Sequence, residues 1–168
     1  MVVFPPPIFP NSYYWRDWNG EIPSDALKAG RDSRGESYIA QVYTAGYGEF
    51  IGQIFEDQDE VYVNVANTAT AVVTKSHIGL KILCSEQNDM EWIVSNITRT
   101  PEILDIQANH LIRGGVDTKN LPVYIGRYVD GQNVFVGSVH NPYNMYYVNV
   151  VGVGTYVQTY ELLMLERQ

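Results

Sequence analysis

The sequence Val61-Tyr62-Val63-Asn64-Val65 returns 85 residues later as Tyr146-Tyr147-Val148-Asn149-Val150. Other matches share this offset of 85 residues: Gly30 with Gly115, Asp32 with Asp117, Phe50 with Phe135, and Gly52 with Gly137. A constant offset at several places indicates an internal duplication rather than chance similarity between valine-rich segments. The sequence therefore predicts two tandem units of the same fold.

The repeated stretch itself predicts a β-strand. Its alternation places Val61, Val63 and Val65 on one face of the strand and Asn64 on the other. We expect the valines of both copies to form the shared core. Asn64 and Asn149 are expected on the outward face or between the two units.

Further strands are predicted wherever β-branched and aromatic residues lie between glycine-rich turns. They are expected at residues 38–43, 49–55, 61–65, 70–74 and 79–84 of the first unit, and at 91–94, 111–116, 123–129, 133–140, 145–151 and 155–165 of the second. Sustained helical periodicity is absent from the sequence. The expected fold class is all-β, with two tandem pseudo-symmetric antiparallel β units packed or intertwined as one compact body.

The chain divides into three predicted segments. Residues 1–14 contain four of the eight prolines, which predicts an extended N-terminal arm. Residues 15–84 form the first unit and residues 92–165 the second. The second unit is longer near its start by about seven residues, so we expect an insertion near residues 101–110.

Composition limits the possible partners and compartment. The formal net charge of −8, without a cluster of Lys or Arg, argues against binding to nucleic acid. A single cysteine, Cys84, excludes an intramolecular disulfide. No leader is evident in residues 1–14 and no segment approaches the ~20 apolar residues of a membrane span. A cytoplasmic protein is expected, with unconventional secretion or a removed leader as the alternatives.

Catalytic and metal-binding motifs are not evident. His77, His110 and His140 have no Cys, His or carboxylate neighbour at a metal-ligand spacing. No nucleophile and base can be paired, so we expect no enzyme activity, cofactor or metal. The acidic residues 56–60 could attract calcium, but a solvated hairpin tip is the more common role of such a turn.

One known family shares the frame of the first unit. This frame comprises Trp15, then Gly20-x-Ile22-Pro23-x-x-Ala26-Leu27-x-Ala29-Gly30-x-Asp32, then Tyr38-Ile39-Ala40 and Gly52-x-Ile54. It resembles the DM-nine repeat, tandem pairs of which form natterin-like mannose-binding lectins. The resemblance extends over residues 15–165 and is more degenerate in the second unit.

The resemblance implies an all-β fold, mannose-type glycans as ligands, a frequent homodimer and a role in innate recognition. In the lectins an aspartate and a later lysine hold the sugar hydroxyls. The matching positions here are Asp32 with Gln53 and Asp117 with Ser138, so both aspartates are kept and both lysines are replaced. A serine is too short to replace lysine, which makes the first unit the better candidate site.

Two functions remain open at this point. The first is a weakened carbohydrate-binding site in which Asp32 and Gln53 contact the sugar and Tyr43 or Tyr47 packs against its ring. The second is a structural or protein-interaction protein that keeps the scaffold without sugar binding. The aspartates also have a structural alternative, because an aspartate after a strand glycine commonly caps its own turn.

Overall fold

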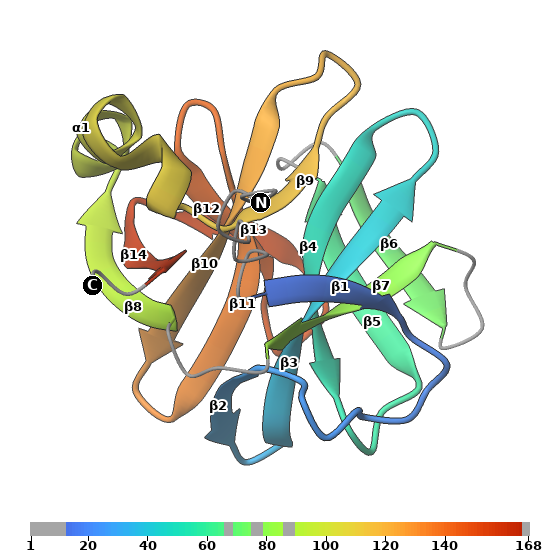
Figure 1. Cartoon of the computed structure of the whole chain (residues 1–168). Helices are drawn as coiled ribbons and strands as arrows, with labels where there is room; N and C mark the ends of the chain where they lie inside the picture. The colour runs from blue at the N-terminus through green and yellow to red at the C-terminus, as the bar shows by residue number, and fades with distance from the viewer. Residues whose placement is uncertain (1–12, 66–68, 75–78, 86–89, 166–168) are drawn as a thin grey trace, which may run out of the picture.

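The computed structural model describes residues 13–65, 69–74, 79–85 and 90–165 (Figure 1). All but the last two residues of the predicted N-terminal arm lie outside this part of the chain. Within these residues two antiparallel sheets pack against each other, and one short α-helix accompanies them. The prediction of an all-β body made of two units is therefore confirmed.

The first sheet is formed by residues 13–85. Its strands are β1 (Tyr13–Asp17), β2 (Lys28–Asp32), β3 (Gly35–Thr44), β4 (Gly48–Phe55), β5 (Glu60–Val65), β6 (Ala69–Thr74) and β7 (Leu80–Ser85). They lie in the order β1-β7-β3-β4-β5-β6, with β2 paired to β3.

The second sheet is formed by residues 90–165. Its strands are β8 (Met90–Asn96), β9 (Arg113–Val116), β10 (Pro122–Asp130), β11 (Asn133–His140), β12 (Asn144–Val148), β13 (Gly154–Val157) and β14 (Thr159–Leu165). Their order is β8-β14-β10-β11-β12-β13, with β9 paired to β10. Each strand of the first sheet thus has a counterpart in the same place of the second.

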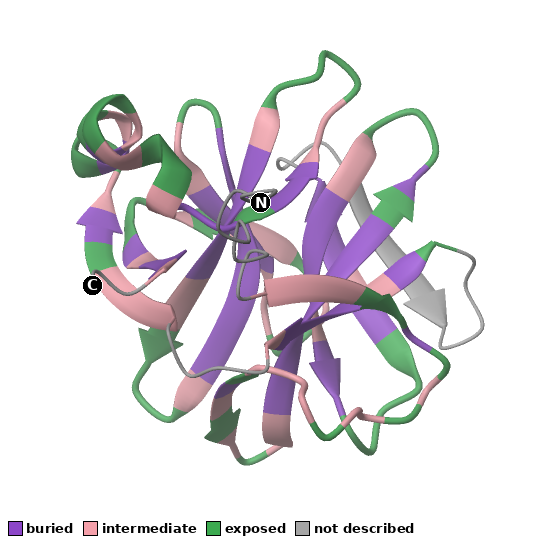
Figure 2. Cartoon of the chain, viewed as in Figure 1, coloured by how far each residue is buried: buried purple, intermediate pink, exposed green. Residues whose placement is uncertain are grey.

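One hydrophobic core joins the two sheets. It contains most buried apolar side chains of the first unit together with Ile112, Val123, Ile125, Val136 and Leu163 of the second. A further cluster, around Tyr124, Phe135 and Leu162, belongs to the second unit alone. Figure 2 shows the buried segments running along the middle of the strands, with exposed residues in the connecting loops. The units therefore share one core, because neither sheet covers its apolar face alone.

The repeated stretch fulfils its prediction in the first copy. Val61, Val63 and Val65 are all buried, and Asn64 lies between the units, where its amide donates to the carbonyls of Tyr147 and Thr155. The second copy differs, because β12 ends at Val148 rather than at residue 151. The expectation that Val150 lies in the core is wrong: this side chain is exposed.

Asn149 explains the early end of β12. Its side-chain oxygen accepts hydrogen bonds from the backbone N–H groups of Val151 (3.1 Å) and Val153 (3.0 Å), which turns the chain. Such a local bond competes with the strand ladder, as asparagine side chains often do. The equivalent residue Asn64 uses its amide for a contact between units instead.

The sequence did not predict the short helix of the insertion, where α1 (Arg99–Gln107) and the 3-10 turn η1 (Ala108–His110) occur. Local features form this helix. The Asn96 side chain accepts hydrogen bonds from the N–H groups of Thr98 and Arg99, and Pro101 lies in the first turn, where its missing N–H costs nothing. Only Thr100 and Ile103 of this helix are buried, so it has almost no apolar periodicity to reveal it. No helix in the described residues is long and apolar enough to cross a membrane.

Candidate functional site

The functional candidates meet at one edge of β11. Strand β12 pairs with β11 from Ser138 to His140, so the outer backbone groups of Val134 and Val136 have no strand neighbour. Side chains of the first unit bond these groups instead. They come from β4 and from the β2–β3 turn, which the shared core holds against β11.

Asp32 and Gln53 both bind this edge. The Val134 N–H donates to Oδ2 of Asp32 at 3.0 Å, and the amide of Gln53 donates to the Val134 carbonyl at 2.9 Å. Val136 N–H in turn donates to Oε1 of Gln53 at 3.3 Å. The two residues that the sequence grouped therefore do converge, but their polar groups hold the second unit.

Arg34 completes this junction. Its Nη2 lies 2.7 Å from Oδ2 of Asp32 and also donates to the Val134 carbonyl at 3.0 Å. Its guanidinium lies over the rings of Phe55 (4.5 Å) and Phe135 (5.2 Å). The Asp32 side chain is 0% exposed and that of Arg34 is 22% exposed. The result is a rigid cation at the boundary between the units.

The second unit makes the equivalent of one of these contacts to the first unit. Ser138, which is 85 residues after Gln53, accepts a hydrogen bond from the N–H of Ile51 at 2.8 Å, and Ile51 is 85 residues before Val136. Ser138 is 0% exposed. In this structure its hydroxyl holds β4 and does not reach solvent, which separates it from the sugar-contacting role that the resemblance implies.

The two aspartates cap their own turns in the same way. Oδ1 of Asp32 accepts from the N–H of Arg34, and Oδ1 of Asp117 accepts from the N–H of Lys119, both at 2.8 Å. Their second oxygens differ, since Oδ2 of Asp117 bonds Nε2 of His140 at 2.9 Å. The structural alternative that the sequence left open thus describes both turns.

These bonds set the acid response of both carboxyl groups. Burial pushes the pKa of Asp32 upward, but hydrogen bonds from the Arg34 side chain and from the Val134 and Arg34 N–H groups hold the pKa below the usual 3.8. The pKa of Asp117 is likewise lowered from 3.8, because hydrogen bonds from the Leu121 N–H, His140 and the Lys119 N–H outweigh the opposing effect of burial.

A carboxyl group whose pKa is lower in the folded than in the unfolded state stabilises the fold at any pH above its unfolded-state pKa. This stabilisation is lost as the pH falls through the folded-state pKa. We therefore expect the free energy of unfolding to decrease below about pH 4. Urea titrations between pH 7 and pH 2 measure it. The slope below pH 4 should be smaller in Asp32→Asn, and an unchanged slope would contradict the assigned bonds.

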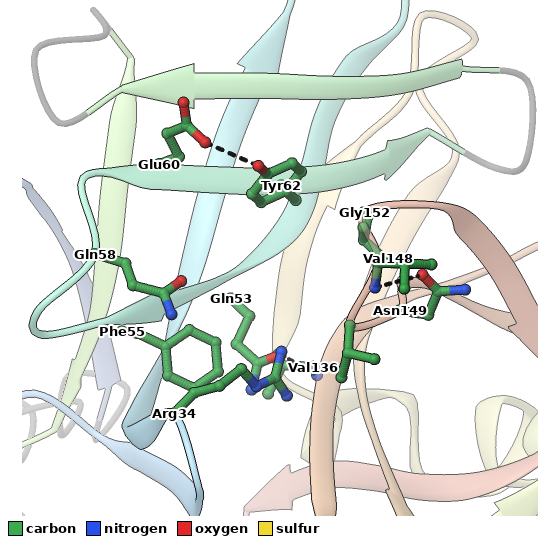
Figure 3. Close-up of a pocket in the computed structure, with 12 residues that line it drawn as sticks. Arg34, Gln53, Phe55, Gln58, Glu60, Tyr62, Val136, Val148, Asn149 and Gly152 are labelled. Atoms are coloured by element: carbon green, nitrogen blue, oxygen red, sulfur yellow. Dashed lines mark hydrogen bonds between the residues drawn. The ribbon is translucent and has the colours of Figure 1, made fainter.

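A groove of about 290 Å³ opens beside this junction (Figure 3). Its lining includes Gln53, Phe55 and Val136. Residues of both units form its walls: Arg34, Gln58, Glu60 and Tyr62 from the first, and Val148, Asn149, Val150, Val151 and Gly152 from the second. The volume is at the lower end of the roughly 300–1,000 Å³ of small-ligand pockets.

Several polar groups in the groove keep bonding capacity. The side-chain amide of Gln58 makes no hydrogen bond within the described part of the chain, and Oε2 of Glu60 accepts only from the Tyr62 hydroxyl (2.8 Å). Nη1 of Arg34 is also without a bond to the described residues. The residues that line this groove thus include a neutral donor, a carboxylate and a guanidinium.

The sequence identified one of these lining residues, Gln53, and the neighbouring Asp32. It missed Arg34, Gln58 and Glu60, although the last two belong to the acidic turn that it singled out. Tyr43 is 53% exposed and does not line the groove. Among the residues described, no group of three or more His, Cys, Asp or Glu side chains is placed to hold a metal ion.

No known family model matches this sequence, and no curated protein matches it at a significant level.

Proposed function

We propose that this chain is a non-catalytic carbohydrate-binding protein for mannose-type glycans, and that the groove between its units is the sugar site. The observation that carries the proposal is a groove of about 290 Å³ between the units, whose lining includes the cation Arg34, the amide Gln58 and the carboxylate Glu60. Innate recognition of glycans is the biological role that accompanies it.

The groove offers what a pyranose requires. Vicinal hydroxyls both donate and accept, and here Arg34 and Gln58 can donate while Glu60 accepts. Hydrogen bonds that include a charged partner are about twice as strong as neutral ones. The ring of Tyr62 adds apolar area for the C–H face of a sugar. In this proposal Arg34 and Glu60 together take the role of the lysine of the family motif, at whose position this chain has Gln53.

The proposal assigns one site to each chain. The counterpart of Gln53 is the fully buried Ser138. Gly52 lies against the Tyr62 carbonyl and its counterpart Gly137 against the Tyr146 carbonyl, so the counterpart of Glu60 is Asn144. The second unit therefore has neither the side-chain amide of Gln53 nor the carboxylate of Glu60. Sugar binding should have a stoichiometry of one per chain.

Calorimetric titration with methyl α-mannoside and a glycan panel tests the site. We expect weak binding that Glu60→Gln reduces about tenfold or more, since a bond to a charged group is worth roughly 1.5–3 kcal/mol. Glu56→Gln is the matched control, because Glu56 is exposed in the same acidic turn but does not line the groove. Equal affinities of the two variants, or no binding of any glycan at millimolar sugar, would refute the proposal.

A protein-interaction role is the second candidate. It is favoured by three exposed valines in the β12–β13 turn, Val150, Val151 and Val153, of which Val151 is 77% exposed. Clustered exposed apolar side chains commonly mark interaction surfaces. The expected homodimer belongs to this proposal, and light scattering coupled to size-exclusion chromatography measures it directly.

A further inference from the structure

A second cavity, of about 320 Å³, lies between β1, β3 and β4 of the first unit and β9 of the second. It is lined by Tyr13, Trp15, Gln41, Glu49, Arg113, Gly115 and Val116. None of these residues lines the sugar groove. The cavity therefore needs its own explanation.

The duplicated fold shows what occupies the equivalent place in the second unit. Trp15 lies opposite Leu83 of β7, and Trp92 lies opposite Leu163 of β14, so the two tryptophans correspond. The strand next to each pair carries a further residue on the same face: Gln41, opposite Lys81, in the first unit, and Arg127, opposite Glu161, in the second. Gln41 and Arg127 are thus equivalent.

In the second unit, Arg127 fills the space over the tryptophan. Its guanidinium carbon lies 4.5 Å from the Trp92 ring, and its Nη1 donates to the Ala29 carbonyl at 2.8 Å. Its Nε and Nη2 bind both carboxylate oxygens of Glu161, at 3.1 Å and 2.8 Å. One guanidinium thus stacks on an indole, pairs with a carboxylate and bonds a carbonyl of the other unit.

In the first unit, Gln41 makes only the hydrogen bond to a carbonyl of the other unit. Its amide donates to the Gly114 carbonyl at 2.6 Å, and Gly114 is the counterpart of Ala29. Glutamine is shorter than arginine and carries no cation for the Trp15 ring. The cavity is the space that the missing guanidinium leaves.

The carboxylate has moved to a neighbouring position. Glu49 lines the cavity, whereas its counterpart in the second unit is Val134. Glu49 forms no ion pair with a described residue. The cavity thus presents an aromatic face and an acidic group, and the net charge of −8 favours the approach of a cation.

We propose that this cavity binds the guanidinium group of a ligand, which stacks on Trp15 and pairs with Glu49 as Arg127 stacks on Trp92 and pairs with Glu161. Cations bind aromatic faces within about 6 Å of the ring centre, and tryptophan is the best of the aromatic side chains. A planar guanidinium also matches a carboxylate through two parallel hydrogen bonds.

Arg113 lines the same cavity. Its charge allows an experiment to distinguish a free arginine-like molecule from an arginine side chain within a peptide. A free arginine-like molecule can place its own carboxylate near Arg113, whereas an arginine side chain within a peptide cannot. N-acetyl-arginine should therefore bind more tightly than N-acetyl-arginine amide if the ligand is a free amino acid derivative. Equal affinity identifies a peptide side chain.

Titration of the full chain with N-acetyl-arginine amide, followed by calorimetry and tryptophan fluorescence, tests the proposal. The neutral isostere N-acetyl-citrulline amide should bind several-fold to about thirtyfold more weakly, the range that one cation–π contact supplies. The double variant Gln41→Arg with Lys81→Glu rebuilds the Arg127–Glu161 arrangement inside the cavity, so it should abolish binding. Glu49→Gln should weaken binding without filling the space.

The sugar groove provides the control for these variants. Binding of methyl α-mannoside should be unchanged in all of them, so the two sites can fail independently. Equal affinity for the arginine and citrulline amides, or undiminished arginine binding in both Glu49→Gln and the double variant, would overturn the proposal.

Discussion

Replacing Asp32 with alanine is expected to lower the free energy of unfolding by about 3–5 kcal/mol, the cost of breaking a buried ion pair by removing one partner. The Asp32 side chain is fully buried against Arg34, and it also accepts the N–H of Val134 across the boundary between the units. Its loss leaves a guanidinium and a backbone donor without their acceptor. Urea unfolding at pH 7 measures the effect.

Asp57→Ala is the matched control for this variant. Asp57 is exposed in the turn after β4, so its replacement should change stability by less than about 0.5 kcal/mol. If Asp32→Ala were no more destabilising than Asp57→Ala, Asp32 would not be a tie between the units. Its carboxylate would then be open to the ligand role that the family resemblance implies.

Replacing Gly115 with alanine is expected to lower stability by about 3 kcal/mol, the upper part of the usual range for overpacking. A Cβ atom at this position would lie 2.3 Å from the backbone oxygen of Glu49 in the other unit. Because the obstacle is backbone, no side-chain rotation relieves it, and the two sheets must separate locally. Thermal and urea unfolding both report this loss.

Gly131→Asn is the control for this second variant. Gly131 has a φ of +57°, which asparagine tolerates, and nothing lies within 4 Å of a Cβ built there. Its stability should remain close to that of the parent chain. Equal stability of the Gly115→Ala and Gly131→Asn variants would show that β4 and β9 do not approach each other as closely as described.

Sequence patterns predicted the fold well because they act over short and regular distances. Alternation of valines determines which face of β5 is buried, and the offset of 85 residues aligns the strand order of the two sheets. The helix at Arg99–Gln107 was missed because it lacks such a regular pattern. It depends on one capping asparagine and two buried side chains, which leave no periodic signal.

The candidate site was only partly predictable. Asp32 and Gln53 lie together in the structure, but their bonding partners are backbone groups of β11 that lack a strand neighbour. Which backbone groups remain unpaired depends on where β12 stops pairing, and this is decided by a turn more than 90 residues away from Gln53 in the chain. No local pattern around Asp32 carries that information.

Differences between the copies prove more informative than their similarities. The two copies differ where Glu60 corresponds to Asn144, where Gln41 corresponds to Arg127, and where Glu49 corresponds to Val134. Both proposed sites lie at such places. We infer that the duplication supplied the scaffold, and that divergence between the copies supplied the two cavities.

Mapping by nuclear magnetic resonance tests the central claim most directly, that the groove between the units holds a sugar. The ¹⁵N-labelled chain would be titrated with methyl α-mannoside. The largest shift changes are expected at the side-chain amide of Gln58 and the backbone amide of Gly152, because both residues line the groove. Shift changes centred on Tyr43 or Asp117, or none at saturating sugar, would contradict it.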